Sequence, residues 1–136
     1  MNVFFRRMTV FAVGGFSYVG IELIWRGHTH WSMLAAGGVC LLLMFEIFSS
    51  CQNLSLPSKA LIGAAVITGV EFVFGMIFNY WFKMNVWDYS NNKFNILGQI
   101  CPLYTFLWGI LSIPASYLCT NLKRKFDKHN VIQKTQ

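Results

Sequence analysis

Three of the five acidic residues, Glu22, Glu46 and Glu71, lie inside long apolar stretches of the chain. A charged side chain at the centre of a bilayer costs about 2.5–3.5 kcal/mol or more, so such a residue faces other helices or a wet cavity rather than lipid. Burial favours the neutral carboxyl, whereas a nearby cation favours the carboxylate. These acids are therefore the first candidates for a site that binds an ion, a proton or a polar group.

Glu22 has a candidate partner on its own segment. Arg26 follows four residues later, which is the favourable order of acid and base along a helix, and His28 and His30 come next. Two interpretations stay open: a polar site for an anion, a proton or a headgroup, or an ion pair that fixes the depth and packing of a helix end. Glu46 lies near the end of its own segment, where its side chain can reach the membrane interface, and we expect it to have a structural role.

Glu71 belongs to a stripe of small and polar residues spaced three or four positions apart. This stripe consists of Ala60, Ala64, Thr68, Glu71, Gly75 and Asn79. A matching stripe later in the chain consists of Gln99, Pro102, Thr105, Gly109, Ser112 and Ser116. Small residues let helix backbones approach closely, so the two stripes predict helix packing, and a polar pocket between the helices is the alternative. The predicted packing residues are Ala64, Thr68, Gly75, Gly109, Ser112 and Ser116.

A polar loop follows the third apolar stretch, over residues 82–95. Asp88 and Ser90 suit an Asx turn, and Asn95 is placed to cap the helix that comes after the loop. If the apolar stretches are helices of alternating direction, this loop lies on the same side of the membrane as Glu22 and Arg26. The predicted substrate- or ion-binding residues are Glu22, Arg26, His30, Glu71, Asp88, Tyr89, Ser90, Asn95 and Gln99.

Catalysis and cofactor binding have little support in the sequence. A hydrolase needs a nucleophile, a base and an orienting group within reach of one another, and the spacing of Ser90, His30 and Asp88 does not single them out for these roles. The chain has no P-loop, no glycine-rich nucleotide fingerprint and no HExxH motif. Its four cysteines form no CxxC pair. We therefore expect no cofactor and no metal, and a non-catalytic role in preference to an enzyme.

The composition fixes the class of protein that holds these residues. Of 136 residues, 55% are hydrophobic and only 12% are charged. Soluble domains carry about 25% charged residues, and a soluble fold of this size could not cover so much apolar surface. The chain is therefore predicted to be an integral membrane protein.

Four apolar segments are long enough to cross a bilayer as helices, which takes about 20 residues. They span about 3–25, 31–49, 58–81 and 96–118. Helix is expected because lipid cannot satisfy open backbone groups, and the period-two alternation of a barrel is absent. Since the connections are short, consecutive helices are antiparallel neighbours. The predicted fold is all-α, a four-helix transmembrane bundle that forms a single domain over residues 1–120.

The basic residues predict the orientation in the membrane. The formal net charge is +6, and most cations lie near the chain ends or beside the second loop: Arg6, Arg7, Lys59, Lys123, Arg124, Lys125, Lys128 and Lys134. Because cytoplasmic segments are enriched in lysine and arginine, both termini are expected in the cytoplasm, with residues 121–136 as a basic tail. No soluble domain is present to organise nucleic-acid binding. We expect a multi-pass protein of the cell membrane.

Several sequence motifs resemble a known family of membrane proteins. They are Glu71-Phe72, Trp87-Asp88-Tyr89-Ser90, Phe94-Asn95-Ile96-Leu97-Gly98-Gln99-Ile100-Cys101 and Trp108, with Gly14-Gly15, Tyr18, Glu22 and Arg26 in the first half. Together they resemble the ABC-transporter type IV, or CmpB-like, permease family, most clearly over residues 70–118. The resemblance implies a bacterial multi-pass membrane protein. It marks as positions to test Glu22, Arg26, Glu71, Trp87, Asp88, Tyr89, Ser90, Asn95, Gly98 and Cys101.

Three functional hypotheses follow. The first is a small permease-like or transporter-associated subunit with an outward-facing polar site for a small solute or lipid headgroup. It would work as a homo-oligomer or with other membrane or ATPase subunits, because the chain carries no nucleotide-binding motif. The second is a membrane-embedded lipid-binding protein or enzyme at the outer leaflet, which needs Glu22, Arg26, His30 and Asp88 to converge. The third is a holin-like or structural membrane protein.

Overall fold

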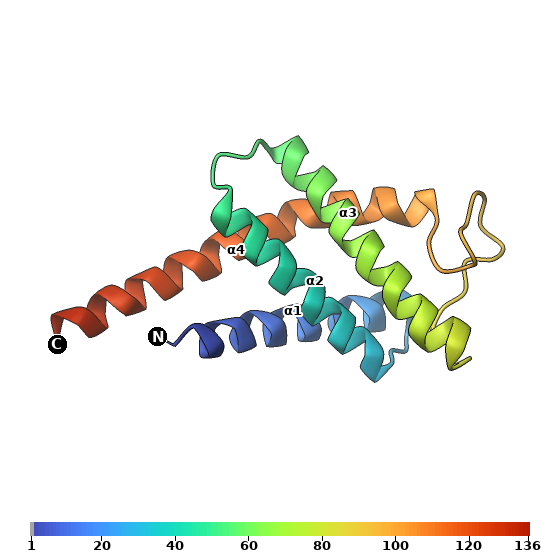
Figure 1. Ribbon diagram of the computed structural model, residues 1–136, viewed down its shortest axis with the longest axis horizontal. Helices are drawn as coiled ribbons and strands as arrows, with labels where there is room; N and C mark the ends of the chain where they lie inside the picture. Colours follow the sequence, from blue (N-terminus) through green and yellow to red (C-terminus); the bar gives the residue numbers. More distant parts are fainter. Residues whose placement is uncertain (1) are drawn as a thin grey trace.

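A computed structural model describes residues 2–136 (Figure 1). Within this range the chain folds into helices α1 (Val3–Arg26), α2 (Trp31–Ser50), α3 (Leu56–Phe74) and α4 (Pro102–Thr135). A π-helical segment, η1 (Gly75–Trp81), continues α3. The helices of residues 2–136 provide four apolar spans long enough to cross a membrane, and no strand is present in this range. The prediction of an all-α bundle of four transmembrane helices is confirmed.

Local signals in the sequence set the helix ends. The Asn2 side chain accepts a hydrogen bond from the Phe4 N–H at 3.1 Å and starts α1. Gly27 ends it with a φ of 76°, a left-handed conformation that costs glycine little. Ser55 caps α3 by accepting from the Ser58 N–H. Capping residues of this kind can be recognised in a sequence. The observed ends of α1 and α2 accordingly differ from the predicted ends by one residue.

The helices pack as two pairs, α1 along α2 and α3 along α4. Glycines bring α1 and α2 together: a Cβ added to Gly14 would lie 2.7 Å from the Gly37 carbonyl oxygen. In the other pair, a Cβ on Gly63 would overlap the Ser112 side chain. Because membrane helices associate through close packing of small residues, these contacts account for the pairing.

The α3–α4 contact uses most of the two polar stripes. The Thr68 and Thr105 hydroxyls are 2.9 Å apart and share a hydrogen bond across it. Ser112 and Ser116 are buried in α4. A Cβ on Gly109 would meet Ala64 at 3.6 Å. Gly75 differs from these residues, because it faces the 82–101 loop instead of α4.

The fourth helix differs from its expected limits at both ends. It begins at Pro102 rather than at 96, because residues 96–100 form a tight reversal with an antiparallel bridge between Ile96 and Ile100. It then continues to Thr135 through the segment predicted as a tail. No glycine or proline follows Pro114 to end the helix. Phe126 is buried and meets the Phe45 ring edge-on, with the centroids 6.0 Å apart.

Both chain ends lie at one end of the bundle, and the 82–101 loop lies at the other (Figure 1). This arrangement follows from the alternating direction of the helices. The loop end therefore gathers the C-terminus of α1, the N-terminus of α2 and the end of η1 around the loop.

Candidate functional site

The 82–101 loop is fixed to the end of α3 by a buried hydrogen-bond network. Asn79 accepts from the Val86 N–H at 2.7 Å and donates to the Gln99 side-chain oxygen at 3.0 Å. The Trp87 indole donates to the Gln99 carbonyl at 3.0 Å. The π-helical segment brings Gly75 against this network, where an added Cβ would lie 3.0 Å from the Trp87 ring. Gln99, predicted as a binding residue, thus accepts hydrogen bonds that hold the loop against η1.

Three other predicted site residues also hold the loop together. Asp88 accepts from the Ser90 N–H at 2.9 Å in the expected Asx turn, and this hydrogen bond lowers the pKa of the exposed Asp88 carboxyl. Asn95 donates to the carbonyls of Ser90 and Asn92 and accepts from the Gly98 N–H. The expectation that Asn95 caps α4 is therefore wrong, because the intervening reversal places Cys101 at the cap position.

His30 lies at the start of α2 and acts as its cap. Its Nδ1 accepts from the Ser32 N–H at 3.2 Å, and the ring packs beside Trp31. His30, Asp88 and Ser90 do not line the main cavity described below. The enzyme hypothesis needs Glu22, Arg26, His30 and Asp88 together, and only Glu22 and Arg26 line this cavity.

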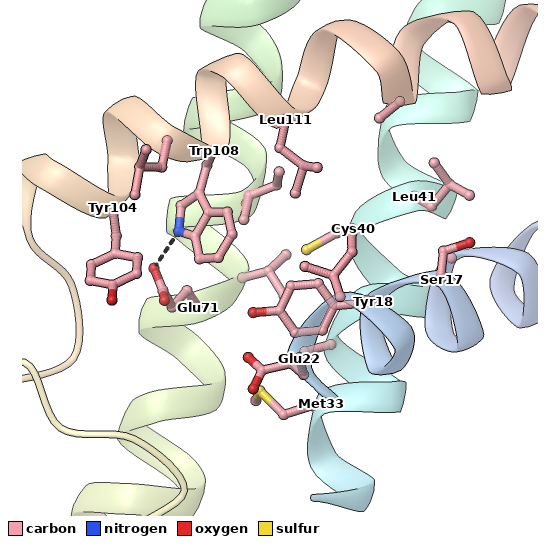
Figure 2. Close-up of a pocket in the computed structure, with 18 of the residues that line it drawn as sticks. Ser17, Tyr18, Glu22, Met33, Cys40, Leu41, Glu71, Tyr104, Trp108 and Leu111 are labelled. Atoms are coloured by element: carbon pink, nitrogen blue, oxygen red, sulfur yellow. Dashed lines mark hydrogen bonds between the residues drawn. The ribbon is translucent and has the colours of Figure 1, made fainter. Parts of the chain in front are cut away.

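A partly open cavity of about 420 Å³ lies between the two helix pairs. Most of its wall is apolar and every long helix contributes to it, with Ile21 of α1, Leu41 of α2 and Leu111 of α4 among the lining side chains. Figure 2 shows Leu41 and Leu111 in this wall. Helix α1 adds Tyr18 and Glu22. The polar groups gather toward the loop end of the bundle. We call this space the carboxylate cavity.

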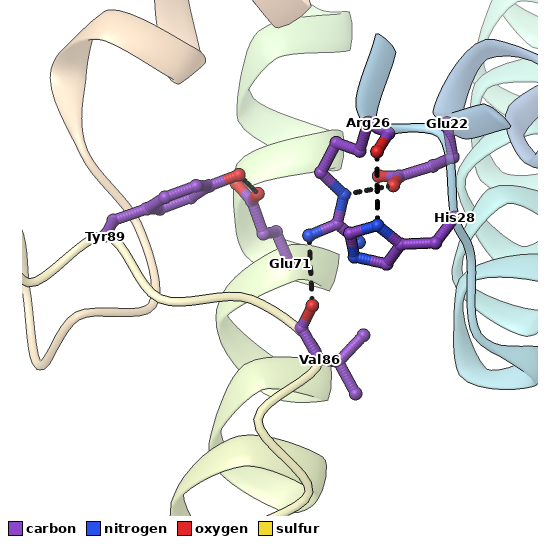
Figure 3. Close-up of polar contacts among 6 residues, drawn as sticks. All are labelled: Glu22, Arg26, His28, Glu71, Val86 and Tyr89. Atoms are coloured by element: carbon purple, nitrogen blue, oxygen red, sulfur yellow. Dashed lines mark hydrogen bonds and ion pairs between the residues drawn. The ribbon is translucent and has the colours of Figure 1, made fainter. Parts of the chain in front are cut away.

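Glu22 and Arg26 form an ion pair at the polar end of the carboxylate cavity. The Arg26 Nε lies 2.6 Å from the Glu22 carboxylate, and the two side chains are largely buried. Arg26 also donates to the Val86 carbonyl at 3.0 Å, which ties α1 to the loop (Figure 3). This geometry agrees with the expected spacing of acid and base on one helix turn.

Glu71 reaches the same cavity from α3 but has different partners. One carboxylate oxygen accepts from the Tyr89 hydroxyl at 2.6 Å, and the other accepts from the Trp108 indole at 3.0 Å (Figures 2 and 3). Within residues 2–136, no lysine, arginine or histidine nitrogen lies within 4.0 Å of it. Burial, reinforced by the Glu71 carboxylate, raises the pKa of Tyr89, so its hydroxyl remains a donor.

Aromatic rings from α1, from α4 and from the loop line the cavity around Glu71. Tyr89 stacks on Tyr104 with centroids 4.5 Å apart, and Tyr104 lies 5.9 Å from Trp108. Tyr18 of α1 lies on the other side of Trp108, with the two ring centroids 6.1 Å apart. The site therefore combines a carboxylate, neutral hydrogen-bond donors and ring faces above an apolar groove.

Comparison with family models identifies the chain. The model described as "Putative ABC-transporter type IV" matches residues 9–134. The chain belongs to this family. No curated protein and no solved structure matches it significantly. Together with the four spans, membership makes the chain a multi-pass membrane protein associated with transport.

The match to the ABC-transporter type IV family covers more of the chain than the motifs alone indicated. It includes the first-half residues Tyr18, Glu22 and Arg26 as well as the 70–118 region. These residues meet Glu71 at one cavity in the structure. Tyr104 was not singled out from the sequence. Its i,i+4 spacing from Trp108 was the available signal, because it places both rings on one face of α4.

Proposed function

We propose that this chain is a transport-associated subunit of the cell membrane that holds an amphipathic molecule in the carboxylate cavity. The headgroup, of a small solute or a lipid, would lie at the Glu22, Arg26 and Glu71 end. The apolar part would follow the groove between the helix pairs. The observation that carries this proposal is the joining of a polar cluster and an apolar groove in one cavity.

The size and position of the carboxylate cavity support a ligand site. Its volume of about 420 Å³ lies within the range of small-molecule pockets, roughly 300–1,000 Å³. Ionisable residues inside membrane helices are costly, and a solute or ion pathway is the default hypothesis for them. Glu22 and Glu71 come from different helix pairs and line the same space, so a change in the spacing of the pairs would alter the site.

The distribution of cations supports an outward-facing site. Arg6 and Arg7 lie in the first turns of α1, and five further cations lie in the second half of α4, at the end of the bundle where α1 begins and α4 ends (Figure 1). Lys59 lines a cavity together with Lys123 and Arg124 of α4. The positive-inside rule therefore favours a cytoplasmic position for this end and an outer position for Glu71. The absence of a nucleotide-binding motif from the sequence favours partnership with a second copy or with an ATPase subunit.

Binding of a radiolabelled 12-carbon amphiphile tests the proposal. The purified chain is placed in nanodiscs of an uncharged galactolipid, and binding is measured above that of empty nanodiscs. Leu111→Trp inserts a larger side chain into the groove and is expected to reduce binding at least about tenfold, since overpacking leaves no room for the chain.

Leu103→Trp is the matched control because it makes the same change at an exposed position of α4 outside the cavity. It is expected to bind like the wild type. Equal binding by the wild type and the Leu111→Trp variant would overturn the proposal. Native mass spectrometry of the same sample counts the chains in each particle and detects a homo-oligomer.

A further inference from the structure

The charges that line the carboxylate cavity do not balance. Its wall carries Glu22, Arg26 and Glu71, and no other Asp, Glu, Lys or Arg side chain lines it in the part of the chain that is described. Glu22 and Arg26 neutralise each other in their 2.6 Å ion pair. Ionised Glu71 therefore leaves the cavity with a net charge of −1. Buried charges are normally paired, so this carboxylate lacks a counter-ion.

The contacts of Glu71 stabilise its ionised form without neutralising it. Both carboxylate oxygens accept a hydrogen bond, one from Tyr89 and one from Trp108. Indole nitrogen can only donate, and hydrogen bonds to a charged acceptor are about twice as strong as those between neutral groups. The two donors hold the carboxylate at a fixed position in the cavity wall (Figures 2 and 3). A cation that enters the cavity would complete the pairing.

The aromatic rings suit one kind of cation in particular. Tyr18, Tyr89, Tyr104 and Trp108 all line the cavity beside Glu71. Ring faces attract ammonium and quaternary ammonium groups, and they do so without the directed hydrogen bonds that an inorganic ion would require. The wall offers few oxygen ligands besides the two carboxylates, which argues against a hard metal cation.

We propose that the carboxylate cavity binds an amphiphile with a single ammonium or trimethylammonium headgroup, with Glu71 as its counter-ion. This inference rests on the proposed function and names its ligand class. The headgroup would lie between the Glu71 carboxylate and the aromatic rings, and the hydrocarbon chain would lie along Leu41, Ile67 and Leu111. The ammonium group could belong to a membrane lipid or to a free amphiphilic amine.

The experiment compares headgroup charge at constant chain length. Dodecyltrimethylammonium and the uncharged dodecyldimethylphosphine oxide are titrated against the chain in galactolipid nanodiscs, which contain no ammonium group. The wild type is expected to prefer the cation at least about tenfold, after subtraction of binding to empty nanodiscs. Glu71→Gln is expected to remove this preference while the uncharged probe binds as before, which also shows that the variant is folded.

Glu46→Gln is the matched control, because Glu46 is an acid in an apolar helix outside the cavity. It is expected to keep the wild-type preference. Equal binding of the two probes by the wild type would overturn the inference and leave the proposed function intact. Failure of both probes to bind would instead refute the proposed function. The comparison of the two probes on the wild type needs no variant. It therefore tests whether the cavity prefers a cationic headgroup even if Glu71→Gln does not fold.

A third probe distinguishes the two sources of the ammonium group. Dodecylphosphocholine carries the trimethylammonium group together with a phosphate, as a membrane lipid does. Competition equal to that of dodecyltrimethylammonium would support a lipid ligand. Weak competition would support a free amphiphilic amine, because the phosphate would be excluded by the Glu22 and Glu71 carboxylates.

Discussion

Two cavities of almost equal size lie in different parts of the bundle, and they differ in charge and in polarity. The carboxylate cavity has a volume of about 420 Å³, a mostly apolar wall and one unpaired acid. The second cavity, of about 410 Å³, lies where the end of α2 and the start of α3 meet α4; we call it the basic cavity. Its charged residues are Lys59, Lys123, Arg124 and Asp127, which give a net charge of +2.

The comparison shows that position in the membrane decides what a charge does. The basic residues come from the start of α3 and from the part of α4 packed beside it, where long side chains can reach the interface and meet anionic headgroups. Glu71 lies among apolar and aromatic side chains, where a charge without a partner is expensive. The same contrast separates Glu46, in an exposed ion pair with Arg7, from Glu71. We propose that charge excess at the interface orients the protein and that charge inside the bundle binds a ligand.

Reversing the charge of the carboxylate cavity should have the largest effect. Glu71→Lys changes the net charge of the cavity from −1 to +1, which gives it the sign of the basic cavity. We expect dodecyltrimethylammonium affinity to fall at least about 100-fold, because the lost attraction is replaced by repulsion at short range. Glu46→Lys makes the same charge change outside the cavity and should keep wild-type affinity. Comparable losses in the two variants would show that the effect is not local.

Removing charge from the basic cavity should weaken binding of anionic lipid. Each lysine or arginine near a membrane surface contributes about 1 kcal/mol to this attraction. Lys123→Gln combined with Arg124→Gln is therefore expected to reduce phosphatidylglycerol retention about thirtyfold in native mass spectra, and less at high salt. Binding of dodecyltrimethylammonium should not change. A parallel loss of both ligands would show that the two cavities are not independent.

Breaking the Glu22–Arg26 pair should have a smaller effect. Glu22→Gln leaves Arg26 without its counter-ion, which brings the net charge of the carboxylate cavity to zero. We expect about a fivefold loss of cation affinity and a destabilisation of about 2 kcal/mol in thermal unfolding, since the pair is largely buried. Adding Arg26→Gln removes the uncompensated cation and should restore much of the affinity. No recovery in the double variant would argue against charge balance as the cause.

The smallest expected effect concerns Tyr89. Tyr89→Phe removes one donor to Glu71 and keeps the ring that stacks on Tyr104. We expect about a threefold change in cation affinity, as for the loss of one hydrogen bond. Because burial raises the pKa of Tyr89, its hydroxyl should stay protonated at pH 10. The absorbance change of tyrosine ionisation near pH 10 should therefore be the same in the wild type and Tyr89→Phe, and a smaller change in the variant would contradict this assignment.

The bundle itself could be predicted because hydropathy and local caps act over short distances. Gly27, Ser55 and Pro57 mark helix boundaries, and apolar length marks the spans. The start of α4 could not be predicted in this way. Residues 96–100 are apolar like a helix, but left-handed conformations at Leu97 and Gly98 and the Ile96–Ile100 bridge turn the chain back before Pro102.

The acidic residues of the site could be found from sequence, but their partners depend on the fold. Glu22 and Arg26 are neighbours on one helix turn, so their pairing follows from spacing. The contacts of Glu71 join α3 to Tyr89 in the loop and to Trp108 in α4, across 18 and 37 residues. The sequence predicts His30, Asp88 and Asn95 as site residues because they are polar and fall on the same side of the membrane as Glu22 and Arg26. Their hydrogen bonds serve a cap and a loop, and only the three-dimensional arrangement separates these roles from ligand binding.

A crystal structure with dodecyltrimethylarsonium tests the central claim most directly, because arsenic replaces the headgroup nitrogen and its anomalous scattering locates the positive charge. The account predicts one arsenic peak in the carboxylate cavity, within about 6 Å of the Glu71 carboxylate and of at least one of the surrounding rings. A peak beside Glu46 or at the apolar end of the groove, with none near Glu71, would contradict it.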